Sequence, residues 1–95
     1  MTENSGQTGN TQRTLSPFQS FALSLGSSAM IHLGEIPDPE SRAPRPNLLL
    51  AKATIETLEM LVEKTTGNLT PEEVKTVTGL LSELRMRYVA VKQQT

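Results

Sequence analysis

The sequence contains no cysteine and no tryptophan, and aromatic residues supply only 3% of its 95 residues. Without cysteine, the chain forms neither a disulfide framework nor a thiolate metal site, and it has no thiol nucleophile. The net charge is −1 at pH 7, so no basic excess attracts nucleic acid or an anionic membrane. These absences leave functions that need neither thiol chemistry nor a strong positive field.

A long apolar run is also lacking. Residues 14–34 carry no formal charge, but serine, glutamine, proline and histidine interrupt their apolar side chains. A membrane-spanning helix needs about 20 predominantly apolar residues, and a signal peptide needs a basic leader before its apolar segment. This stretch meets neither requirement, so we expect no membrane association and a cytoplasmic location.

Residues 1–15 hold almost no large apolar side chain. Such a segment buries too little surface to offset its ordering entropy, so we expect a disordered N-terminal tail. Residues 16–92 are predicted to form one small domain. A core of about 80 residues supplies only a few kcal/mol, and association with other chains often supplies more.

Capping and turn residues divide this domain into helices. Ser16 and Gln19 have the spacing of a capping box, which satisfies free backbone N–H groups where a helix begins. Thr70 and Glu73 repeat this spacing, and a glycine follows each of the first two helices, as suits a left-handed terminal residue. No segment alternates with a period of two, so no strand is expected. The predicted helices cover about residues 17–33, 48–66 and 71–92.

Apolar residues recur at steps of three and four in the second and third predicted helices. The loop between them is short, so the two helices are predicted to form an antiparallel hairpin. Leu81 and Leu84 are expected to be buried in it. Their predicted partners are Ile55, Leu58 and Val62. The fold class is therefore all-α, a small three-helix bundle.

The connector before the hairpin, residues 35–46, holds four of the six prolines, which favour an extended path. At about 3.1 Å per residue it spans about 37 Å, whereas the first helix is about 25 Å long. Both a parallel and an antiparallel placement of the second helix against the first are compatible with these lengths.

The first predicted helix has no charged residue, and apolar residues cover more than half of its circumference. In a three-helix monomer, one apolar side of this helix would face water. We therefore expect a homo-oligomer in which the first helix contacts both its own hairpin and a second chain, with Gly26 at a close approach. The candidate interface residues are Phe18, Phe21, Ala22, Leu23, Leu25, Gly26, Ala29 and Met30.

His32, Glu35, Asp38 and Glu40 have side chains of the types that bind transition metals. However, a histidine in the last turn of a helix interacts favourably with the helix dipole, and the acidic residues lack a fixed helical spacing. If His32 were a general base, Ser28, one turn earlier, would be the only candidate nucleophile by position. A serine nucleophile also needs an oriented base and an oxyanion site, so packing or solvation is the commoner role of such a serine. We expect no metal, no cofactor and no catalytic residue, and hence a non-enzymatic protein.

Arg85, Arg87 and Lys92 form the only basic concentration, and there they complement the C-terminal end of the third helix. Nucleic-acid binding is thus a weak alternative, and no nucleic acid is expected as a partner. Met86 and Val89 lie off the main apolar stripe of this helix, which makes them better candidates for a partner surface. The whole candidate partner surface is His32, Glu35, Ile36, Asp38, Met86 and Val89.

Three segments together resemble a small bacterial family catalogued as domain of unknown function 1844. They are HLGEIPDP at residues 32–39, LEMLVEKTTGNLTPEE at residues 58–73 and LRMRYV at residues 84–89. The resemblance covers about residues 16–90 and implies a bacterial, cytosolic, stand-alone helical domain. It implies no activity, cofactor or catalytic residue.

Two functions are compatible with these features. The first is a non-enzymatic interaction or structural protein that acts as a homo-oligomeric helical bundle. The alternative is an accessory subunit that binds another cytosolic protein through the connector and the third helix.

Overall fold

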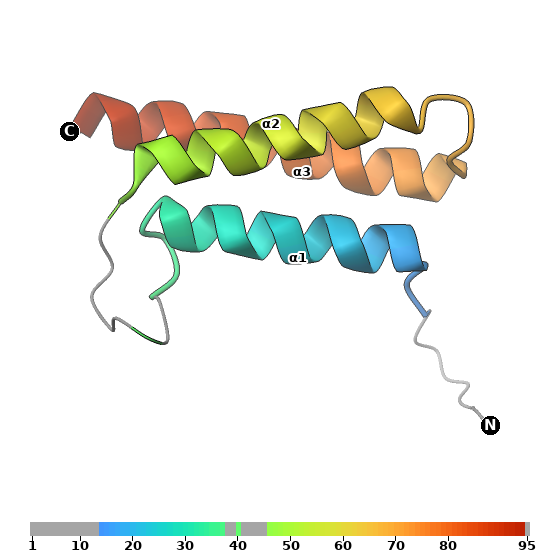
Figure 1. Ribbon diagram of the computed structural model, residues 1–95, viewed down its shortest axis with the longest axis horizontal. Coiled ribbons are helices and arrows are strands. Elements are labelled where there is room, and N and C mark those ends of the chain that lie inside the picture. Colours follow the sequence, from blue (N-terminus) through green and yellow to red (C-terminus); the bar gives the residue numbers. More distant parts are fainter. Residues whose placement is uncertain (1–13, 38–39, 41–45, 95) are drawn as a thin grey trace.

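A computed structural model describes residues 14–37, 40 and 46–94, which form three α-helices and no strand. The helices are α1 (Pro17–His32), α2 (Leu48–Lys64) and α3 (Pro71–Gln94). They lie side by side, and each packs against the other two (Figure 1). The predicted all-α three-helix bundle is confirmed. Of the predicted N-terminal tail, residues 1–13 lie outside the described part of the chain.

The connector brings α2 back antiparallel to α1. Figure 1 shows α2 beginning at the end of the bundle where α1 finishes. The backbone N–H of Asn47 donates to the carbonyl of His32 at 2.6 Å, so the two helix ends are joined directly. Gly34 turns the chain at φ 81° and lies against Pro46. The extended path expected for the connector falls mainly on residues 38–39 and 41–45, outside the described part.

The starts of α1 and α3 are joined through their capping boxes. Ser16 Oγ accepts from the Gln19 N–H at 3.1 Å, and Thr70 Oγ1 accepts from the Glu73 N–H at the same distance. Because both helices begin at the same end of the bundle, Ser16 Oγ also donates to Glu73 Oε2, at 2.5 Å. Gln19 Nε2 donates to Thr76 Oγ1 at 2.9 Å. The capping side chains therefore also form hydrogen bonds between α1 and α3.

This arrangement predicts a pH dependence of stability. The Ser16 hydroxyl, and after it the backbone N–H of Thr70, hold the pKa of Glu73 below its ordinary value. The donors favour the charged carboxylate, so its stabilising contribution is fully present above about pH 4.3, the ordinary glutamate pKa. That contribution is lost as the pH falls through the lowered pKa of the folded chain. Glu73→Gln should therefore lower the urea midpoint at neutral pH, and the deficit should shrink on acidification.

Urea titrations of both proteins at neutral pH and at about pH 3 measure this change. Glu63→Gln is the control, because Glu63 is exposed on α2 and its side chain makes no hydrogen bond or ion pair within the described residues. It should show no comparable dependence. A Glu73→Gln deficit that is the same at both pH values would contradict the prediction.

The core lies along the line where the three helices meet. The predicted burial of Leu81 and Leu84 is confirmed, since they are 4% and 0% exposed. Val62 packs at the edge of this core. Val74, in the first turn of α3, is 44% exposed. The buried apolar residues are Ala22, Ala29, Leu33, Ala51, Ile55, Leu58, Val77, Leu81, Leu84 and Val91.

Small residues let α1 approach the hairpin closely. Ala22, Gly26 and Ala29 are the buried residues within the helix. A Cβ atom placed on Gly26 would lie 2.7 Å from Cδ1 of Leu80 in α3, closer than two carbon atoms normally approach. The predicted close approach at Gly26 is thus present, and its partner is α3 of the same chain.

Candidate functional site

The predicted interface on α1 is divided between the inside and the outside of the bundle. Ala22, Gly26 and Ala29 are buried by the chain's own hairpin, so they leave no surface for a second copy. Their assignment to an intermolecular interface is corrected, because α2 and α3 together cover this side of α1. Phe21 and Leu23 keep 51% and 37% of their surface exposed. Phe18, Leu25 and Met30 are half-buried against the core.

The exposed side of α1 is uncharged. Its serine hydroxyls are small and polar, and that of Ser24 donates back to the Phe21 carbonyl at 2.7 Å. Small side chains let a second helix approach closely, and a hydroxyl that donates to its own helix, as that of Ser24 does, costs far less to bury than a charged group. We call this surface the α1 outer face. It consists of Ser20, Phe21, Leu23, Ser24, Ser27 and Ser28.

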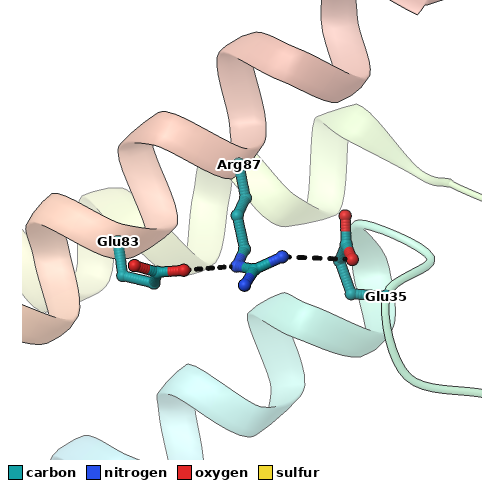
Figure 2. A network of polar contacts seen from close by, with 3 residues as sticks. All are labelled: Glu35, Glu83 and Arg87. Atoms are coloured by element: carbon teal, nitrogen blue, oxygen red, sulfur yellow. Dashed lines mark hydrogen bonds and ion pairs between the residues drawn. The ribbon is translucent and has the colours of Figure 1, made fainter.

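The acidic residue after α1 has a structural partner. Glu35 Oε1 lies 3.2 Å from Nη1 of Arg87, and Nε of the same arginine lies 2.6 Å from Glu83 Oε2 (Figure 2). The arginine thereby holds the start of the connector against α3. Ile36, the residue after Glu35, is 39% exposed. Of the two other acidic candidates, Asp38 lies outside the described residues and Glu40 is exposed.

The two arginines of the basic concentration are both compensated. Arg85 Nη2 lies 2.8 Å from Glu59 Oε2 across the α2–α3 junction, and Arg87 bridges two carboxylates as above. Each pair is exposed, so each contributes at most about 1 kcal/mol. The pairing leaves little positive field around these arginines for a phosphate backbone.

A shallow groove of about 360 Å³ runs between α2 and α3. Val89 lies on its wall and is 52% exposed, and the neighbouring Met86 is 65% exposed. Met86 and Val89 were predicted from the sequence. The α2 side of the groove was not, because all of its residues except Ile55 are charged. The groove is lined by Lys52, Ile55, Glu56, Glu59, Arg85, Tyr88 and Val89.

The predicted partner surface does not form one site. Glu35 contacts Arg87, whereas Val89 faces the groove beside α2. Arg87 and Val89 are two positions apart, so their side chains point about 160° away from each other around α3. They therefore lie on different sides of this helix. The connector residues and the Met86/Val89 side are therefore two separate surfaces.

The described residues contain one histidine, His32, and no cysteine. No group of three or more histidine, aspartate or glutamate side chains among them is placed to hold a metal ion. No helix within these ranges combines the length and the apolar character needed to cross a membrane. His32 is half-buried, and its backbone carbonyl accepts from Asn47. The surfaces just described are thus the clearest functional candidates on this part of the chain.

A family model described as a domain of unknown function, DUF1844, matches residues 16–90. The chain belongs to this family. Membership confirms the resemblance drawn from the three sequence segments. The match begins at Ser16, the N-cap of α1, and ends inside α3, so the DUF1844 domain corresponds to the three-helix bundle. No curated protein and no solved structure matches the chain significantly.

Proposed function

We propose that this DUF1844 protein is a non-enzymatic interaction protein of the cytoplasm that acts as a homo-oligomer through the α1 outer face. The observation that carries the proposal is the lack of any charged residue on this exposed surface. Exposed helix faces of independent domains usually carry charged residues, which keep them apart in solution. Phe21, which is 51% exposed, supplies apolar area that a second copy would bury.

A double substitution tests this proposal. Ser24→Lys with Ser27→Lys places two positive charges per chain on the α1 outer face. Lysine is a better helix former than serine, so the fold of the single chain should keep its stability. Sedimentation velocity at micromolar concentration should show the wild-type chain larger than a monomer and the double variant reduced to a smaller species. Like charges that face each other across an interface cost several kcal/mol, so the contact through the α1 outer face should be lost completely.

The control is Ser82→Lys, an exposed serine on α3 away from this face. It should leave the assembly unchanged. A wild-type monomer at this concentration, or an unchanged assembly in the double variant, would contradict the proposal.

A second candidate function is an accessory subunit that binds another protein through the groove between α2 and α3. The exposed Met86 and Val89 beside this groove favour it, because methionine adapts to varied apolar partners. A soluble monomer that captures a partner from native lysate, and loses it on Met86→Lys, would favour this function over self-association. Salt-dependent retention on nucleic acid would favour the weaker third alternative.

A further inference from the structure

The solvent side of α2 carries a set of residues with an internal symmetry. Leu49 is 79% exposed, the largest value for a large apolar residue in the described part of the chain, and Met60 is 43% exposed. Between them lie the exposed Lys52, Ala53 and Glu56. At about 100° per residue, all five fall within an arc of about 100°. Leu49, Ala53 and Met60 point away from the core. Lys52 and Glu56 lie at the edge of the arc that borders the groove between α2 and α3. We call this set the α2 outer face.

Charge on this face is arranged so that a second copy complements it. The midpoint of Lys52 and Glu56 is Thr54, and the midpoint of Leu49 and Met60 lies between Thr54 and Ile55. The two midpoints differ by half a residue, about 0.8 Å along the helix. If two copies meet antiparallel about a two-fold axis at this point, each lysine faces the partner's glutamate. Each Leu49 then faces the partner's Met60.

The details of the face agree with such a pairing. Ala53 lies near the centre, where a small side chain permits the closest approach of two helices. Lys52 and Glu56 make no side-chain ion pair or hydrogen bond with any residue in the described part of the chain. Their charges are thus available to a partner. A two-fold contact requires one surface that is its own complement, and this face has that property.

We propose that the α2 outer face is a second self-association site, at which two copies pair antiparallel through α2. It is separate from the α1 outer face and does not depend on it. Two different two-fold contacts on one chain build a closed tetramer if their axes cross at a right angle and a larger assembly if they do not. The occupant is therefore a second copy of this chain.

Charge reversal gives a sharp test. Lys52→Glu leaves the face with two negative charges, and Glu56→Lys leaves it with two positive charges. Each variant alone should raise the dissociation constant of the α2 pairing by about tenfold or more, because two attractive pairs per dimer become repulsive. A mixture of the two variants should associate again as a heterodimer, since each new charge then faces its opposite. The double variant Lys52→Glu with Glu56→Lys should also self-associate.

These measurements are made on the full chain carrying Ser24→Lys and Ser27→Lys, so that contacts through the α1 outer face are removed. Sedimentation equilibrium should show a dimer in this background and a monomer when either charge reversal is added. Circular dichroism should show at most a small loss of helix content in each single reversal, because two like charges at i,i+4 destabilise a helix by only about 0.2–0.5 kcal/mol. In the double variant, the order of glutamate before lysine favours the helix slightly. Failure of the α1 proposal alone would appear as an assembly insensitive to the double lysine change but still sensitive to the charge reversals.

The proposal is overturned if the background chain stays monomeric up to about 1 mM, a weak limit for specific association. It is also overturned if single charge reversals associate like their parent, or if mixing them does not restore the dimer.

Discussion

Replacing Leu84 with alanine is expected to lower the free energy of unfolding by about 2–5 kcal/mol. Leu84 has no exposed surface and belongs to the core cluster that contains Leu58 and Leu81. Truncation removes apolar atoms from a closely packed interior and leaves a cavity that three rigid helices fill only in part. The loss is a large fraction of the total, because small domains are stable by only about 5–15 kcal/mol.

Urea denaturation followed by circular dichroism measures this loss. Met86→Ala is the matched control on the same helix, because Met86 is 65% exposed. It should change the free energy of unfolding by no more than about 0.5 kcal/mol. A Leu84→Ala effect below about 1 kcal/mol would mean that the core does not lie on this side of α3.

Gly26→Leu is expected to destabilise the folded chain by about 1–3 kcal/mol or more, as overpacked cores do. The new Cβ alone would lie 2.7 Å from Leu80 Cδ1 and 3.3 Å from Leu80 Cγ, so the Leu80 side chain must move to admit even one added carbon atom. The clash outweighs the gain of about 1 kcal/mol that glycine replacement brings to a helix. The destabilisation should appear in the single chain, whatever its state of assembly.

A second glycine provides the opposite result. Gly79 lies within α3, and a Cβ placed there would meet no atom within 4 Å. Gly79→Leu should therefore raise the free energy of unfolding by about 0.5–1 kcal/mol through helix propensity alone. Thermal melts of the two variants should move in opposite directions from the wild type. Melts that rise for both would contradict the close packing of α1 on α3.

The same contact can be tested from its other side. Leu80→Ala removes the atoms that would meet a side chain at position 26. The double variant should therefore be more stable than the sum of the two single changes predicts, with a coupling energy of about 0.5–3 kcal/mol. Additive changes would place the strain of Gly26→Leu elsewhere in the bundle.

Local chemistry in the sequence was sufficient for the elements and for much of the core. Ser16 and Thr70 begin helices because capping depends on residues only three positions apart. Gly34 and Gly67 have positive φ angles, a conformation that few other residues tolerate, and each follows a helix as predicted. The buried side of the hairpin followed from a spacing repeated over several turns. Each of these features is decided by short-range geometry.

For α1, the sequence did not show which part of the helix surface is buried. Its apolar arc was evident, but the part covered by the chain's own helices depends on how α2 and α3 approach it. The structure buries Ala22, Gly26 and Ala29 and leaves Phe21 and Leu23 exposed. A periodic pattern gives the direction of each side chain around its own helix but does not locate the neighbouring helices.

The sequence by itself determined three helices, their capping residues, the hairpin and the family. Only the tertiary structure decided that α2 runs antiparallel to α1, because the connector is long enough for either direction. The hydrogen bond from Asn47 to His32 shows that α2 begins beside the end of α1. The tertiary structure also decided that Glu73 links two helix starts and that Arg87 holds Glu35. These pairs are separated by more than fifty positions, and no local propensity brings such distant groups together.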